Sequence, residues 1–323
     1  MLLAIFILLN LSLGSVDIPF KSILFTLTGN DIVKESWQYI ILEYRLPKAI
    51  TAVLVGSGLS ISGLLMQTLF RNPLAGPFVL GISSGASLGV ALLVLGVAIF
   101  SGSIVGFAFS NLFLALAASI GALFVLSAVM IVARKVKNTM SILIIGLMFG
   151  SFTAAIISVL AYFSSAENLQ QYVFWTFGSL GNLGWDEILI IGGIYLVSIG
   201  VLMSIIKPLN SLLLGENYAV SLGVNLKRTR NITLIVTGIL TGVITDFSGP
   251  IAFIGLAVPH LNKLLIKSSN HRILLPAVAI MGAIIMLISD TIAQLPLSEF
   301  SLPITAVTSL FGAPIVIWLL VRK

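Results

Sequence analysis

The chain has 323 residues, of which 58% are hydrophobic and only 9% are charged. A soluble domain carries about a quarter charged residues, so this composition excludes a soluble protein and indicates one surrounded by lipid. Cysteine is absent and there are only two histidines, so we expect no disulfide, no metal site and no cofactor. The net charge of +6 does not predict a nucleic-acid partner, because basic residues also gather in the cytoplasmic loops of membrane proteins.

Apolar segments follow one another along the whole chain, without the alternation that a membrane β-barrel needs. A helix satisfies its backbone hydrogen bonds internally, as a segment in lipid must. The sequence therefore predicts an all-α, polytopic membrane protein with about ten transmembrane helices in one domain over residues 1–323. The ten segments are 1–16, 47–69, 77–100, 109–133, 141–163, 186–206, 231–246, 250–267, 273–294 and 303–321.

The distribution of basic residues fixes the expected orientation. With the N-terminus inside, thirteen of the seventeen Lys and Arg residues fall on the inner side and four on the outer side. Because Lys and Arg are enriched in cytoplasmic loops, we expect both termini to be cytoplasmic. Two longer connections result from this topology, an external loop at 17–46 and a cytoplasmic loop at 207–230 that mixes apolar and basic residues. The cytoplasmic loop could lie on the membrane or dock into a partner.

Two Pro- and Gly-containing breaks indicate an internal symmetry. The second segment ends in the break at 72–77, and the seventh, which runs the opposite way, ends in the break at 248–252. Breaks five segments apart that point to opposite sides are typical of inverted repeats, so we expect inverted-repeat-like halves.

The sequence gives little support for catalysis or ATP binding by this chain. Gly81–Gly85 matches the G-x-S-x-G pattern of hydrolases, but that pattern should follow a strand, and His260 and His271 lie at the cytoplasmic ends of their segments. No nucleotide-binding P-loop occurs, so ATP would have to be used by another subunit.

Three acids near external segment ends leave a second class of transporter open. An ion-coupled secondary transporter needs intramembrane acids, and Asp246, Asp290 and Glu299 are the candidates. For Asp290, the interpretation we favour is a buried acid that forms hydrogen bonds at a helix end. The alternative function is therefore an ion-coupled transporter that works without an ATPase.

Several motifs in a fixed order resemble those of the FecCD-type permease family, which imports iron-siderophores, haem or cobalamin. The resemblance covers nearly the whole chain and implies the membrane-spanning permease of an ATP-driven importer in the inner membrane, not an enzyme. It also implies a homodimer with a second copy, two ATP-binding cassette subunits and a periplasmic or lipid-anchored substrate-binding protein. The motifs include Arg45-Leu46-Pro47-Lys48, Asn72-Pro73-Leu74-Ala75, Leu214-Gly215-Glu216, Gly249-Pro250-Ile251-Ala252 and Gly312-Ala313-Pro314.

The resemblance also assigns roles to individual residues. Arg45 and Lys48 match the basic pair on which the binding protein docks, although Lys48 replaces the usual Arg and can offer only a point charge. Gln294 stands where the family often has another basic residue, and Thr305 where Gly is common. Asn72, Leu74 and Thr139 match the cytoplasmic gate. The residues that match the loop coupled to the ATPase are Leu214, Gly215, Glu216, Ala219, Leu222, Gly223 and Val224.

Overall fold

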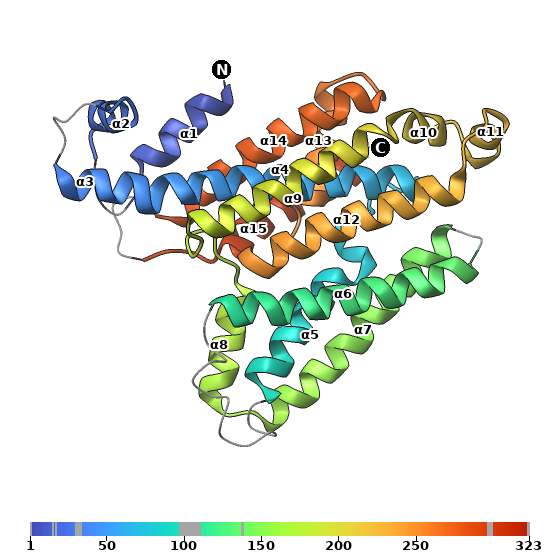
Figure 1. Ribbon diagram of the computed structural model, residues 1–323, viewed down its shortest axis with the longest axis horizontal. Helices are drawn as coiled ribbons and strands as arrows, with labels where there is room; N and C mark the ends of the chain where they lie inside the picture. Colours follow the sequence, from blue (N-terminus) through green and yellow to red (C-terminus); the bar gives the residue numbers. More distant parts are fainter. Residues whose placement is uncertain are drawn as a thin grey trace.

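The computed structural model describes residues 2–14, 16, 18–29, 34–96, 111–136, 139–295 and 300–321. These residues form helices and connecting loops, and no β-strand occurs among them (Figure 1). In chain order the elements are α1 Leu2–Ser12, α2 Phe20–Leu27, α3 Glu35–Tyr39, the π-helix η1 Ile40–Arg45, α4 Leu46–Leu69, the 3₁₀-helix η2 Pro77–Leu80, α5 Ile82–Val94, α6 Asn111–Lys135, α7 Thr139–Phe163, α8 Ala166–Thr176, α9 Trp185–Met203, α10 Ile206–Leu212, α11 Glu216–Ser221, α12 Leu226–Ser248, α13 Ile254–Leu265, α14 His271–Ala293 and α15 Ile304–Val321.

Each of the ten predicted apolar segments contains a helix. Among the described residues, six helical stretches are long and apolar enough to cross a membrane: 35–69, 112–135 and the helices α7, α9, α12 and α14. The shorter helices α1, α5, α13 and α15 account for the other four segments. The predicted all-α, multi-pass fold is confirmed.

The second span is longer than the sequence suggested. Helix α3, η1 and α4 form one continuous helical stretch from Glu35 to Leu69, so the second half of the predicted external loop at 17–46 is part of this helix. The π-helical turn ends at Arg45, directly before the first turn of α4, where Pro47 lacks the N–H that an α-helix interior uses. The external loop is therefore largely helical.

Close backbone contacts pack α4 and α5 against their neighbours. A side chain added to Gly63 of α4 would overlap the carbonyl oxygen of Gly255 in α13. A side chain at Gly85 of α5 would meet the carbonyl oxygen of Gly121 in α6. Glycine at these positions therefore lets the helix backbones approach closely.

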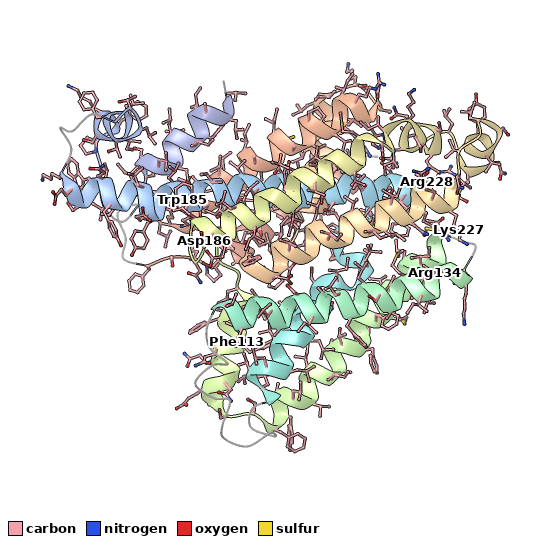
Figure 2. The ribbon with its side chains drawn as sticks, in the orientation of Figure 1. Phe113, Arg134, Trp185, Asp186, Lys227 and Arg228 are labelled. Atoms are coloured by element: carbon pink, nitrogen blue, oxygen red, sulfur yellow. The ribbon has the colours of Figure 1, made fainter. Side chains whose placement is uncertain are left out.

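The helices have two distinct ends (Figure 1). Helices α2 and α3 lie at one end and α10 and α11 at the other, and the breaks after α4 and α12 lie at opposite ends, as expected for inverted halves. Figure 2 shows Arg134, Lys227 and Arg228 at the end with α11, while Trp185 and Asp186 lie toward the other end. The basic end is the predicted cytoplasmic side.

Candidate functional site

Asp290 is the centre of a buried polar cluster near the external end. Its carboxylate lies 3.1 Å from the ammonium of Lys48, in an ion pair that joins α14 to α4. The amides of Asn10 and Gln294 donate to the other carboxylate oxygen at 2.9 and 2.7 Å. A buried charge is tolerated only when it is paired and hydrogen-bonded, and all three partners meet that requirement here. The preferred interpretation of Asp290 as a hydrogen-bonded helix-end acid agrees with this geometry.

Arg45 is buried and makes its contacts within the chain. Its guanidinium donates to the carbonyl oxygens of Leu11 at 2.6 Å and Ser12 at 3.0 Å, and also to that of Val16. The carbonyls of Leu11 and Ser12 belong to the last turn of α1, which has no intrahelical partners for them. Arg45 therefore caps α1 and fastens it to the long helix, whereas Lys48 keeps 25% of its side chain exposed.

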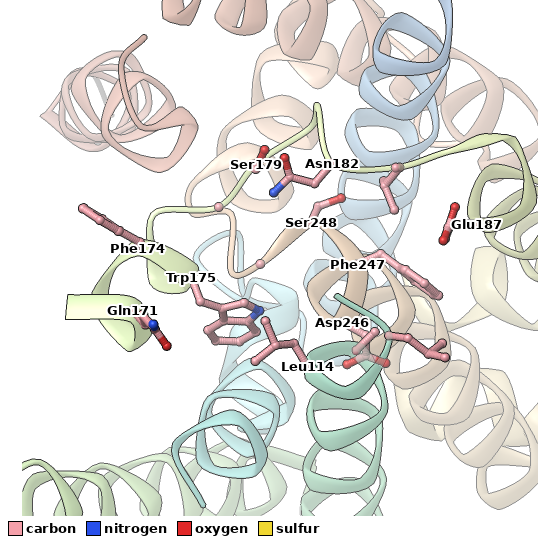
Figure 3. A pocket seen from close by; sticks show the side chains of 15 residues that line it. Leu114, Gln171, Phe174, Trp175, Ser179, Asn182, Glu187, Asp246, Phe247 and Ser248 are labelled. Atoms are coloured by element: carbon pink, nitrogen blue, oxygen red, sulfur yellow. The ribbon is translucent and has the colours of Figure 1, made fainter. Parts of the chain in front are cut away.

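A cavity of about 230 Å³ opens at the external ends of α6, α8, α9 and α12 (Figure 3). Asp246 lies in its wall with 5% of its surface exposed, and the hydroxyl of Ser119 donates to one carboxylate oxygen. The other oxygen has no hydrogen-bond partner among the described residues. Glu187, also in the wall, accepts from the backbone N–H of Gly184 at 3.0 Å and caps α9. The third candidate acid, Glu299, lies outside the described residues.

Thr305 explains one departure from the family pattern. Its hydroxyl donates to the carbonyl oxygen of Pro250 at 2.8 Å, and its backbone N–H donates to Phe177 at 3.3 Å. Glycine would provide the second contact but not the first. The start of α15 is thereby tied to the break after α12.

At the cytoplasmic end, the loop after α4 is held by its own side chain. The carbonyl oxygen of the Asn72 side chain accepts from the backbone N–H of Leu74 at 2.9 Å, as in an Asx-turn, and Leu74 is exposed. Thr139, the first residue of α7, donates its hydroxyl to a carboxylate oxygen of Glu216 at 2.8 Å. The structure thus joins one predicted gate residue directly to the predicted coupling loop.

The coupling loop is two short helices with an exposed apolar surface. Gly215 and Gly223 have φ angles of 113° and 80°, which favour glycine, and they bracket α11. Ala219 is fully buried and anchors α11, and Val224 is half-buried. The surface consists of Leu214, Tyr218, Val220 and Leu222, which are 65, 53, 54 and 57% exposed.

A histidine that the sequence did not single out for this role ties the coupling loop to the spans. The buried ring of His271 contacts Asn210 of α10 through Nδ1 at 2.7 Å and the hydroxyl of Thr68 in α4 through Nε2 at 2.9 Å. The amide oxygen of Asn210 can only accept, so Nδ1 is the donor. The available signal was its place next to Asn270, the N-cap of α14.

The surroundings of Ser83, the serine of the G-x-S-x-G pattern, do not support the hydrolase alternative. Ser83 lies in the first turn of the helix α5, and its hydroxyl faces the hydroxyl of Thr245 at 3.4 Å. Another hydroxyl cannot act as the general base that a serine nucleophile needs.

Known proteins resemble this chain over most or all of its length. The sequence model of the FecCD transport family matches residues 2–322. The vitamin B12 import system permease proteins BtuC of Salmonella typhi and Salmonella newport are each 37% identical over 287 residues, covering 88% of this chain and 85% of theirs.

Solved structures show the same arrangement of helices. One described as an inward-facing conformation of a metal-chelate type ABC transporter has a TM-score of 0.85 and 31% identity, covering 100% of this chain and 97% of its own. PsaBC from Streptococcus pneumoniae, in complex with Fab, has a TM-score of 0.54 and 15% identity over 85% of this chain and 90% of its own, a likeness in fold alone.

Proposed function

Because the chain belongs to the FecCD transport family, we propose that it is the permease of an ATP-driven importer that moves a bulky metal chelate into the cytoplasm by alternating access. It is a multi-pass protein of the inner membrane, and its family consists of transport subunits rather than enzymes. The observation that carries the proposal is the hydrogen bond between Thr139 and Glu216, since it connects the coupling loop to a spanning helix.

The exposed surface of the coupling loop supports a separate ATP-binding subunit. Leu214, Tyr218 and Leu222 form an apolar patch on a cytoplasmic loop, which is typical of a protein interface. Two such subunits, one for each permease copy, would bind ATP, because the chain has no P-loop. Movement of α11 would then pull on α7 through Glu216.

The proposed cytoplasmic gate is linked to the coupling loop through the hydrogen bond between Thr139 and Glu216. Thr139 starts α7, and Asn72 and Leu74 form the turn after α4, so closure of the ATPase would move these elements relative to each other. Only 17% of the most apolar stretch of α7 is buried within the chain. We propose that a second copy faces α7 across the pathway in a homodimer.

The cargo we favour is a corrinoid such as cobalamin rather than an iron-siderophore, because the curated relatives are vitamin B12 permeases. The described residues contain no group of three side chains that could hold a metal ion, which fits a cargo that enters with its metal already chelated. Specificity then belongs to the substrate-binding protein outside. We assign its docking to the external end, where Lys48 is a partly exposed cation and Arg45 positions α1.

The test is the ATPase activity of the ATP-binding partner, with and without this permease in nanodiscs, in the presence of loaded binding protein. We expect the permease to raise turnover and Glu216→Lys to remove most of this increase. Asn217→Lys is the control, because it introduces the same lysine side chain at the exposed neighbour and leaves the Thr139–Glu216 hydrogen bond in place. Equal loss in both variants would contradict the assigned role of Glu216.

The second candidate, an ion-coupled transporter, is favoured by one observation, the unpartnered carboxylate oxygen of Asp246. Uptake that continues without any ATP-binding subunit and is abolished by Asp246→Asn would establish it in place of the importer.

A further inference from the structure

A groove of about 760 Å³ lies in the cytoplasmic half of the molecule, between α4, α9, α10 and α14. Its walls are mostly apolar, with Ile61 from α4, Ile199 and Leu202 from α9 and Leu275 from α14. From Tyr195 to Met203 the groove follows α9 for about 12 Å along the helix axis. The groove therefore has the depth and the lining to hold part of an acyl chain.

Two cations stand at the cytoplasmic mouth of the groove. Lys207 of α10 and Arg272 of α14 both line it, both are exposed, and no carboxylate is among its lining residues. Among the described residues neither Lys207 nor Arg272 forms an ion pair with a carboxylate, and the pair of Lys48 and Asp290 lies at the other end of the molecule. The mouth thus combines two positive charges with an adjoining apolar surface.

The position of Arg272 increases the preference for an anion. It lies in the first turn of α14, where the helix dipole is unfavourable for a cation and favourable for an anion. The neighbouring backbone N–H groups of His271 and Arg272 are already occupied by the side chains of Asn210 and Asn270. An anion at this place would therefore be bound by the two side-chain cations.

We propose that this groove binds an anionic phospholipid of the inner leaflet, with its phosphate between Lys207 and Arg272 and an acyl chain against α9 and α14. A basic pocket between spanning helices on the cytoplasmic side is the kind of site that anionic headgroups occupy. The exposed rim residues Leu196 and Met203 keep the groove open toward the surrounding lipid. This proposal depends on the membrane location of the chain and not on the importer function.

Fluorescence quenching can test the site directly, since the chain contains no cysteine. A bimane label on Met203→Cys would report brominated lipids in proteoliposomes. We expect brominated phosphatidylglycerol to quench it more strongly than brominated phosphatidylethanolamine at equal mole fraction. One cation near an anionic lipid is worth about fivefold in affinity, so Lys207→Gln should weaken phosphatidylglycerol binding about fivefold and the double variant with Arg272→Gln about 25-fold.

The control removes two cations from the same end of the molecule but away from the groove. Lys227→Gln with Arg228→Gln, at the start of α12 (Figure 2), should leave the quenching unchanged. A third variant, Ala279→Phe, fills the groove while both cations stay, and it should reduce quenching by phosphatidylglycerol.

Four outcomes would overturn the proposal. They are equal quenching by the two lipids, an equal loss in the Lys227 and Arg228 control, and full competition by soluble glycerol phosphate, which would indicate a phosphate site without lipid. The fourth is a disulfide between two Met203→Cys chains, which would assign the groove to a contact between permease copies.

Discussion

The external and cytoplasmic ends of this molecule differ in how far their side chains are satisfied within the chain. At the external end, Arg45, Lys48 and Asp290 are bound to partners within the chain. At the cytoplasmic end, Leu214 and Leu222 are exposed on short helices. The external cluster therefore holds α1, α4 and α14 together, whereas the cytoplasmic loop exposes an apolar surface that a partner can cover.

The largest effect should come from removing the centre of the external cluster. Asp290→Ala leaves the Lys48 ammonium without its counter-charge and removes one of the acceptors of the Asn10 amide, at a cost of about 3 kcal/mol. We expect a clearly lower melting temperature of the purified protein in detergent. Asp186→Ala, at an exposed external acid, is the control, and an equal drop there would show that the cluster is not special.

Arg45→Gln should have the second-largest effect. It removes charged hydrogen bonds to the last carbonyls of α1, at a cost of about 2 kcal/mol. Limited proteolysis should then cut near residue 14 faster than in the wild type. Lys34→Gln removes an exposed cation from the same external region and should not change the cleavage rate. If Arg45→Gln resists proteolysis like the wild type but no longer binds the substrate-binding protein, Arg45 serves docking rather than the capping of α1.

A double-mutant cycle can test the contact between Thr139 and Glu216 at the cytoplasmic end. Thr139→Val and Glu216→Gln each weaken one hydrogen bond, so each should lower permease-stimulated ATPase activity about fivefold, with little change in melting temperature. The double variant should be no worse than either single variant, because both act on the same contact. Fully additive losses would mean that the two residues act through different partners.

The smallest effect is expected at the external cavity. Asp246→Asn keeps an acceptor for Ser119, so ATP-driven uptake in proteoliposomes should stay within about twofold of the wild type. A complete loss of uptake would indicate that Asp246 serves ion coupling rather than the packing of α12 against α6.

The spans could be predicted from the sequence because lipid imposes a simple rule, about 20 apolar residues for each crossing. The charge asymmetry predicted the orientation by the same kind of rule. Residues 35–45 were assigned to the external loop because they precede the apolar segment at 47–69, but a π-helical turn carries the helix through this point.

The contacts of the candidate sites were beyond reach of the sequence. Asn10 and Asp290 are 280 positions apart, and Thr139 and Glu216 are 77 apart, so no local pattern pairs them. The resemblance to a family supplied the identity of most site residues but not their partners. It assigned docking to Arg45 without indicating that its guanidinium faces the end of α1.

The continuous helix from Glu35 to Leu69 has one further consequence, for the height of the external surface. At 1.5 Å per residue it is about 50 Å long, whereas the hydrocarbon core of a bilayer is about 30 Å thick. Counted back from Leu69 at the cytoplasmic side, about 20 residues bring the helix to the outer boundary close to Lys48. The preceding turns then rise about 20 Å above the hydrocarbon core. A protein arriving from outside would meet a raised rim formed by α3 before it reaches the membrane plane.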